Sequence, residues 1–425
     1  MSDKKSYKDS IFLPDTSFPM RGDLTTKEPA RLEKWEQSKL YERIIGKRQA
    51  QGAPTFILHD GPPFANGDVH MGTALNKTLK DLIVKSKAMA GYYTPFIPGW
   101  DCHGLPIEAK VVNQEQGLEA AEIRRRCADF ANGFIDQQRQ SFRRLGIFAD
   151  WFRPYITMQP AYESNILRVF GKLVADGAVY QSMKPVQWSY AHKTALAEAE
   201  VEYQEDTSTA IFVAFPMTEE VKGIACDMVI WTTTPWTLPS NLGVALNPDF
   251  TYVIARYSKD GESRNFILVR ELIETFCTRN GWQLEEELTT FKGIELEGKS
   301  AKHPFLDRDS LIIMGDFVTT DTGSGAVHIA PGHGADDYKV GMQYGLGVLS
   351  PVDDAGCYTA ECGLPQLVGK HVFESNEDVI AILLGLGRML GREEFSHQYP
   401  HCWRSKTPII FRAVKQFFIS MEKLR

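Results

Sequence analysis

Residues suited to binding a phosphate compound lie together in the first quarter of the chain. His70, Gly72 and Thr73 stand where a helix is expected to begin, just after a Gly- and Pro-rich stretch at 61–67. The first N–H groups of a helix lack partners and carry positive dipole character, so a helix start suits phosphate. A glycine there lets a flat base or ribose approach the backbone. Taken alone, these residues indicate no more than an ordinary helix N-terminus.

A second group of polar residues lies much later in the chain. The run WTTTPWTLPSN occupies 231–241, and the segments GAVH and PGHGADD occupy 325–328 and 331–337. The plain interpretation of the first run is a strand that leads into a proline turn, because threonine favours strands. The plain interpretation of each histidine is a partly buried imidazole with its hydrogen bonds satisfied.

The elements that must position the first group form a βαβ unit. Apolar residues at 56–58 predict a strand, a helix opens at about 69–71, and a second apolar segment at 93–97 ends in GWDCHGLP at 99–106. Ligands of such units bind where strands end and helices begin. In the helix, apolar residues recur at intervals of three and four, which predicts one buried face: Met71, Leu75, Leu79, Leu82 and Ile83. We interpret the lysines 77, 80, 85 and 87 as a solvated face in preference to a contact with nucleic acid or phosphate.

The rest of the chain predicts an α/β protein with an inserted β-rich domain. We expect an N-terminal arm and helix at 1–50 and the first half of a Rossmann-like domain at 51–203, with long helices at 120–151 and 162–176. Short β-rich segments then replace helices, which predicts an insertion at 204–394 and a return to the first domain at 395–425.

Composition narrows the class of protein. The 425 residues have a net charge of −7, so any nucleic-acid partner would have to be bound by local basic patches. Seven cysteines without a CxxC pair predict reduced thiols and a cytoplasmic protein. No signal peptide or apolar run long enough for a membrane span is evident, and we expect no membrane partner.

From about Phe12 to Met421 the chain resembles the N-terminal half of a class I aminoacyl-tRNA synthetase of the isoleucyl type. The resemblance is carried by HDGPPFANG at 59–67, GWDCHGLPIE at 99–108, WTTTPWTLPSN at 231–241 and AVHIAPGHGADDY at 326–338. It implies activation of isoleucine with ATP and Mg²⁺, followed by transfer to tRNA(Ile). The implied catalysis is positioning and charge stabilisation during attack of a carboxylate on the α-phosphate.

The resemblance also assigns roles to residues of the first group. It implies that His70, Gly72 and Thr73 are the catalytic motif and contact ATP together with Gly61, Pro63 and Asn66. It implies that isoleucine is bound by Pro62, Asp101 and His103, with the carboxylate of Asp101 on the ammonium group.

For the second group the resemblance implies an editing site that hydrolyses valine wrongly attached to tRNA(Ile). Asp337 would bind the valine ammonium, His328 would form a wall against isoleucine, and the pocket would be lined by Thr232, Thr233, Thr234 and Asn241. Such a site is needed because a pocket cannot exclude a smaller side chain; isoleucine against valine is the standard illustration of this limit. With no nucleophile pair evident, we expect direct attack by water.

Two departures from the family pattern matter. Thr73 stands where the family has a second histidine, and a neutral hydrogen bond is weaker than a charged one by about 1–2 kcal/mol. The KMSKS loop and the anticodon-binding domain are not found in the sequence, so we expect a fragment that is inactive in ligation by itself, in preference to a natural split protein. The alternatives are an editing-only hydrolase of mischarged tRNA and a non-catalytic tRNA-binding relic. We expect a monomer and no zinc site.

Overall fold

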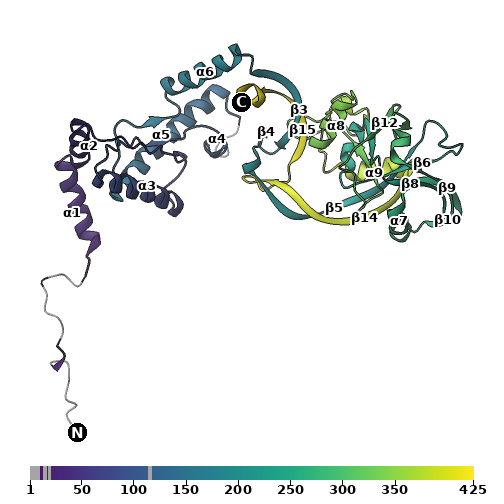
Figure 1. Ribbon diagram of the computed structural model, residues 1–425, viewed down its shortest axis with the longest axis horizontal. Coiled ribbons are helices and arrows are strands. Elements are labelled where there is room, and N and C mark those ends of the chain that lie inside the picture. Colours follow the sequence, from purple (N-terminus) through teal and green to yellow (C-terminus); the bar gives the residue numbers. More distant parts are fainter. Residues whose placement is uncertain (1–9, 13–16, 18–20, 113–116) are drawn as a thin grey trace, which may run out of the picture. The chain divides into compact units, whose positions relative to one another are not determined.

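The computed structural model describes residues 10–12, 17, 21–112 and 117–425, and the chain forms two compact units, Met1–Ala175 and Asp176–Arg425 (Figure 1). Each unit is described by itself. Most of the arm expected before residue 25 lies outside the described residues.

The first unit is mainly helical around a small parallel β-structure. Its helices confirm the expected helical segments at 29–41, 120–151 and 162–176, with shifted ends: α1 Leu24–Gln37, α2 Leu40–Ala50, α3 Met71–Met89, α4 Leu105–Val112, α5 Ala120–Arg144 and α6 Pro160–Ala175. The strands β1 (Gly99–Trp100) and β2 (Tyr155–Ile156) pair in parallel.

The strands expected at 56–58 and 93–97 are shorter than predicted. They are reduced to a parallel bridge between Thr55 and Tyr93, and a second parallel bridge joins Phe64 to Asp101. Prolines explain the interruption, because proline has no N–H to donate to a ladder. They occur at positions 54, 62, 63, 95 and 98.

The predicted orientation of α3 is wrong. The apolar residues expected to be buried are exposed, and the helix instead buries Lys77, Asp81 and Val84. Lys77, expected in solvent, is 1% exposed. Charged side chains can face inward here because they find partners: Asp81 pairs with Lys85 of the same helix at 2.6 Å and accepts a hydrogen bond from the Phe148 N–H of a neighbouring segment.

The second unit confirms a β-rich domain. Its strands are β3 Val179–Ser189, β4 Thr194–Ala195, β5 Val201–Pro216, β6 Asp227–Thr232, β7 Gly243–Leu246, β8 Thr251–Lys259, β9 Glu262–Val269, β10 Gln283–Lys292, β11 Ser300–Lys302, β12 Asp309–Met314, β13 Ala326–Ile329, β14 Met389–Cys402 and β15 Ile410–Ile419. The helices are α7 Ile273–Asn280, α8 Ala335–Gln343 and α9 Asn376–Gly385.

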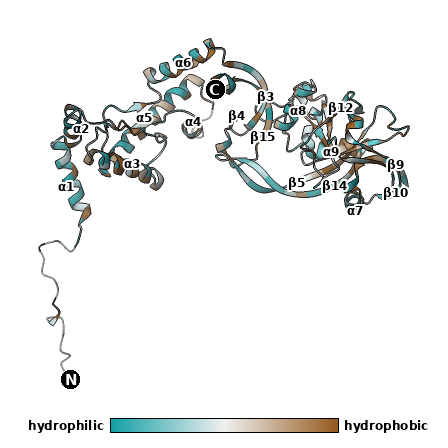
Figure 2. Cartoon of the chain, in the orientation of Figure 1, coloured by the Kyte–Doolittle hydropathy of each residue, from teal (hydrophilic) through white to brown (hydrophobic). Residues whose placement is uncertain are grey.

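These strands form three sheets, in the orders β10-β8-β9-β6-β5-β14, β11-β12-β7-β13 and β15-β3-β4. The segment 210–215 of β5 is a continuous apolar run because its alternate residues enter two different core clusters on the two faces of the sheet. In Figure 2 the brown of hydrophobic residues accordingly appears on the strands near β9, in the middle of the six-stranded sheet.

Long paired strands lie on both sides of the expected insertion in this unit. β3 pairs with β15, and β5 pairs with β14 along its length, so the strands that flank the expected insertion are hydrogen-bonded to each other. The boundaries expected at 203/204 and 394/395 fall inside β5 and β14, while the compact units meet at 175/176.

His303 is a buried histidine in the core of this unit. Its Nε2 lies 2.9 Å from the carbonyl oxygen of Leu238, and its Nδ1 accepts hydrogen bonds from the N–H groups of Phe305 and Leu306. This arrangement fits only a neutral ring with its proton on Nε2. Burial, with the nearby charge of Arg308, lowers the pKa of His303 to about 3.

We expect the free energy of unfolding to fall as the pH decreases below about 6.5. Below this pH the histidine of the unfolded chain binds a proton, whereas His303 in the folded chain stays neutral down to about pH 3. The free energy of unfolding of the wild type should therefore rise between about pH 5 and pH 7, with His303 contributing up to about 1.4 kcal/mol per pH unit. The substitution His303→Gln should reduce this slope. Urea unfolding at several pH values measures it, and equal slopes in both proteins would contradict the assignment.

Candidate functional site

The start of α3 is capped by its own histidine. His70 Nδ1 accepts hydrogen bonds from the N–H groups of Gly72 (3.1 Å) and Thr73 (3.4 Å). Because Nδ1 accepts, the proton lies on Nε2, which is 3.0 Å from the hydroxyl oxygen of Thr73. A Cβ atom at position 72 would lie 3.0 Å from the His70 ring, so glycine makes room for this ring. Thr73 thus orients His70 in the described state, and His70 must turn outward before these N–H groups can meet a phosphate.

The Gly- and Pro-rich loop at 61–67 is held by α4 and α5. Gln138 of α5 donates hydrogen bonds to the carbonyl oxygens of Phe64 (3.0 Å) and Gly67 (2.7 Å). Asn66 donates to the carbonyl oxygen of Pro106 at 3.3 Å, and its own carbonyl oxygen accepts a hydrogen bond from Lys110. These hydrogen bonds hold the loop against α4 and α5.

The structure brings Asp101 beside this loop. The Asp101 N–H donates to the carbonyl oxygen of Pro63, and its carbonyl oxygen accepts from the Ala65 N–H, both at 2.9 Å. The Asp101 side chain is half-buried, and its Oδ1 lies 3.4 Å from the N–H of His103. The His103 ring lies 3.3 Å from Glu163 of α6, a largely exposed contact. Gly61, Pro62, Pro63 and Asp101 thus lie together, while His103 is turned toward α6.

In the second unit, a chain of hydroxyl groups connects the threonine-rich run to a histidine. Thr232 Oγ1 lies 3.3 Å from Thr234 Oγ1, which lies 3.2 Å from Thr237 Oγ1. The Thr237 hydroxyl donates to the carbonyl oxygen of Thr234 at 2.8 Å and lies 2.9 Å from His328 Nε2. Thr233 is half-buried and takes no part in this chain. Thr237 lies within the quoted motif, but only the folded turn shows that it links the threonines to His328.

The hydrogen bonds of Thr237 define the tautomer of His328. Because the Thr237 hydroxyl already donates to a carbonyl oxygen, His328 must donate to it from Nε2–H. Nδ1 is then an acceptor, and it is buried without a hydrogen-bond partner among the described residues. Burial, with the charge of His333 next, lowers the pKa of His328 to about 4, so the ring is neutral near pH 7. A neutral imidazole with a free acceptor nitrogen can orient a water molecule or a hydroxyl group.

Asp337 lies in the first turn of α8, close to β13 in sequence. Its Oδ2 accepts a hydrogen bond from the Ala330 N–H at 2.8 Å. Burial raises the pKa of Asp337 to about 6, and that hydrogen bond opposes the shift. A carboxylate that is costly to leave unpaired is suited to receiving a cation.

His333 and Trp236 were not predicted as site residues. Their rings meet edge to face at 5.0 Å, and the Trp236 Nε1 and His333 Nε2 atoms are buried without hydrogen-bond partners among the described residues. His333 Nδ1 lies 2.8 Å from the carbonyl oxygen of Phe411 in β15, which anchors the loop before α8. The only available signal was their position inside the two quoted motifs.

Asn241 lies in the interior. It is fully buried, its Nδ2 donates to the Gly243 carbonyl oxygen at 2.7 Å, and its Oδ1 accepts from Ser310 at 2.5 Å. These bonds join the start of β7 to β12. We therefore leave Asn241 out of the pocket proposed below.

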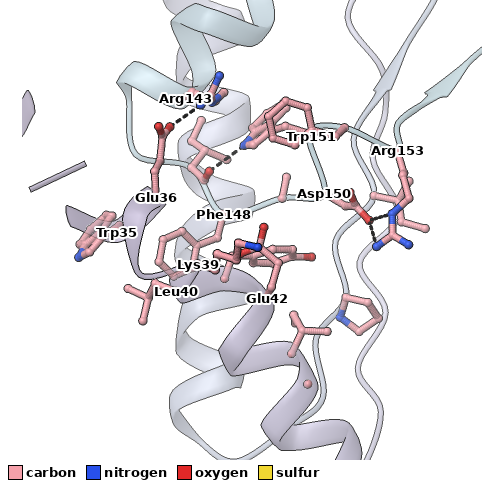
Figure 3. Close-up of a pocket in the computed structure, with 18 of the residues that line it drawn as sticks. Trp35, Glu36, Lys39, Leu40, Glu42, Arg143, Phe148, Asp150, Trp151 and Arg153 are labelled. Carbon is pink, nitrogen blue, oxygen red and sulfur yellow. Dashed lines mark hydrogen bonds and ion pairs between the residues drawn. The ribbon is translucent and has the colours of Figure 1, made fainter. Parts of the chain in front are cut away.

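A large cavity lies elsewhere in the first unit. It measures about 940 Å³ and is lined by residues of α1, α2 and the segment 143–153, with the ion pairs Glu36–Arg143 (2.6 Å) and Asp150–Arg153 (2.8 Å) in its wall (Figure 3). None of the predicted site residues lines it. This cavity is therefore separate from the predicted site residues.

Metal and membrane signals are absent from the part of the chain that the structure describes. Within it, no three His, Cys, Asp or Glu side chains are grouped so that they could bind a metal ion. None of its helices is long and apolar enough to cross a membrane.

Comparison with solved structures gives weak overall superpositions. One match is a leucyl enzyme of Agrobacterium radiobacter K84 (agnB2 LeuRS) in a ternary complex with tRNA and LeuAMS; it is 15% identical with a TM-score of 0.38, and the match covers 92% of this chain and 49% of that one. Another is the GlLeuRS-CP1 structure, 12% identical with a TM-score of 0.35, for which the match covers 44% of this chain and all of that one.

Comparison of sequences is decisive for the family. The chain is 47% identical over 424 residues to isoleucine–tRNA ligases of Bacillus cereus (strain 03BB102) and Bacillus mycoides (strain KBAB4). Each match covers 99% of this chain and 45% of the relative, so the chain spans about half the length of these relatives. Residues 30–425 match the family of tRNA synthetases of class I (I, L, M and V). The chain therefore belongs to the class I tRNA synthetases, with a Rossmann-like α/β fold and a β-rich insertion.

Proposed function

We propose that this chain supplies the ATP and isoleucine site of an isoleucine–tRNA ligase. The observation that carries the proposal is the placement of Asp101 against the Gly61–Pro63 turn, in a chain 47% identical to isoleucine–tRNA ligases throughout. ATP and tRNA(Ile) are the proposed co-substrates. Mg²⁺ would arrive with the phosphates of ATP, since the described residues form no carboxylate cage for it.

In this proposal each residue of the site has its own role. The half-buried carboxylate of Asp101 pairs with the ammonium group of isoleucine, and Pro62 and Pro63 form an apolar wall beside it. The start of α3 receives phosphate once His70 turns away from Gly72 and Thr73, and its Nε2–H then becomes a donor to a phosphate oxygen.

The test is isoleucine-dependent exchange of pyrophosphate into ATP. The protein would carry these 425 residues in place of the matching segment of the Bacillus cereus relative. Asp101→Asn should lower kcat/KM for isoleucine by about 2–4 kcal/mol in transition-state terms, because the ammonium loses a partly buried ionic partner. Asp150→Asn, in the large cavity, is the control and should behave as the wild type. Exchange that survives in the Asp101 variant would refute the assignment.

We further propose that the second unit hydrolyses valyl-tRNA(Ile). The specific observation is the chain of hydroxyl groups from Thr232 to His328, in a unit that also holds the half-buried Asp337, whose pKa is raised to about 6. Asp337 would bind the ammonium group of valine, the hydroxyl chain and His328 Nδ1 would orient the attacking water, and the His328 ring would exclude the larger isoleucine. If this activity alone is found, the chain is an editing hydrolase; if neither activity is found in any context, it is a tRNA-binding relic.

Asp337→Ala should slow deacylation of valyl-tRNA(Ile) by about 2–4 kcal/mol in transition-state terms, the scale for removing one partner of a buried charge pair. Deacylation by the 425-residue chain measures the effect. Its exposed neighbour supplies the control, Asp336→Ala, which should retain the wild-type rate. The rate of the wild type should also fall as the pH drops through about 6, because protonated Asp337 no longer attracts a cation. Equal rates for wild type and Asp337→Ala would refute the anchor.

His328→Ala should have a different effect, because it removes a wall while leaving the ammonium anchor in place. We expect hydrolysis of isoleucyl-tRNA(Ile), which the wild type spares, to rise at least about tenfold. The control is His397→Ala on β14, which bonds to Ser208 and is absent from the hydroxyl chain. If the His328→Ala variant still spares isoleucyl-tRNA(Ile), the His328 ring does not exclude isoleucine.

A further inference from the structure

The carboxylate of Asp60 lies in the first unit, just before the loop at 61–67, and has no role in the site proposed above. Its side chain is completely buried. Oδ2 accepts hydrogen bonds from Lys77 and from the Gly99 N–H (2.9 Å), and Oδ1 accepts from Lys80 at 2.7 Å. Lys80 also donates to the Gly61 carbonyl oxygen at 3.2 Å. One side chain therefore connects three segments that are distant in sequence.

Two of these segments carry residues of the proposed isoleucine site, and the third belongs to the proposed ATP site. Asp60 and Gly61 lead directly into Pro62 and Pro63, Gly99 precedes Asp101 by two residues, and the lysines belong to the helix that begins after His70. The segments 60–65 and 99–101 are in contact. The Asp60–Gly99 bond lies at one end of their contact, and the backbone bonds between Asp101 and the loop lie at the other.

The Asp60 side chain also compensates for missing backbone donors. Backbone bonds between the segments at 54–65 and 93–101 occur at Tyr93 and again at Asp101, and the stretch between them contains prolines. Since proline has no N–H, the ladder is interrupted there. The Gly99 N–H, which lies in this gap, bonds to the Asp60 carboxylate in place of a backbone carbonyl.

Tyr155 contacts both Asp60 and Gly99. Its hydroxyl donates to the Asp60 carbonyl oxygen, and its ring lies against Gly99, where a Cβ atom would come within 2.1 Å of it. Gly99 is thus enclosed between the Tyr155 ring and the Asp60 carboxylate, so its position depends on both.

We propose that Asp60 is a positioning residue for isoleucine binding, because it fixes Gly99 and thereby the distance from Asp101 to the Gly61–Pro63 turn. The inference rests on the isoleucine site proposed above. Lys77 and Lys80 pair with the carboxylate and hold it in this orientation. Lys77 itself is buried, so loss of the Asp60 charge would leave an ammonium group without its partner.

The test uses the 425-residue chain and two readouts. The first is hydrogen exchange of the Gly99 and Asp101 amides, which reports the contact without any ligand. The second is isoleucine binding by calorimetry. Asp60→Ala should increase exchange at Gly99 and Asp101 and weaken isoleucine binding, each by at least about tenfold.

The matched control is Asp81→Asn, which breaks the other ion pair on the inner side of α3 but does not touch the loop or Gly99. It should lower thermal stability as Asp60→Ala does, yet leave isoleucine affinity and exchange at Gly99 within about twofold of the wild type. A role in stability alone would make the two variants alike, and this result would overturn the proposal.

A double variant separates positioning from charge burial. Asp60→Asn keeps an acceptor oxygen for the Gly99 N–H but leaves Lys77 without its partner, so it should be impaired. Adding Lys77→Met removes the stranded charge and should restore most of the protection at Gly99 and of the isoleucine affinity. If the double variant is no better than Asp60→Asn, Asp60 does not act through Gly99. If the wild type binds no isoleucine, the proposed function fails, and the exchange readout still decides whether Asp60 fixes Gly99.

Discussion

The first unit depends on one buried electrostatic arrangement, in which charged residues of α3 face inward and meet partners on neighbouring segments. An ion brought out of water is stable only when it is paired and hydrogen-bonded. Asp60 meets this condition with three donors, and Asp81 meets it with Lys85 and the Phe148 N–H. The Asp60–Gly99 bond lies where the prolines interrupt the backbone ladder, next to the backbone bonds that join the loop at 61–67 to Asp101.

The second unit solves a different problem by similar means. Its sheets bury apolar residues on both faces, and polar groups within this interior must find partners. The threonine hydroxyls and His328 form one chain of contacts and Asp337 accepts a hydrogen bond from the Ala330 N–H, yet His328 Nδ1 remains without a partner among the described residues. A rigid polar cluster with one unused acceptor is what a hydrolytic site needs, because it can orient a water molecule without being rearranged.

The sequence predicted the positions of helices and strands better than it predicted which of their sides is buried. Helical periodicity located α5 and α6, and short β-rich segments indicated the strand-rich second unit. The same periodicity misjudged α3, because it identifies an apolar face but not the side that meets the rest of the protein. The burial of Lys77 depends on Asp60, a partner that no local pattern reveals. The contact between Asp101 and Pro63 and the link from Thr237 to His328 are visible only in the folded chain.

The central claim is that the chain carries two sites with separate tasks, an isoleucine site in the first unit and a valine-clearing site in the second. The most direct measurement is the change in backbone amide NMR signals when free isoleucine is added to the chain. The account predicts changes at 61–67 and 99–103, centred on Asp101, with residues 231–241 and 326–337 unaffected. Changes confined to 231–241 and 326–337, or no changes at saturating isoleucine, would contradict it.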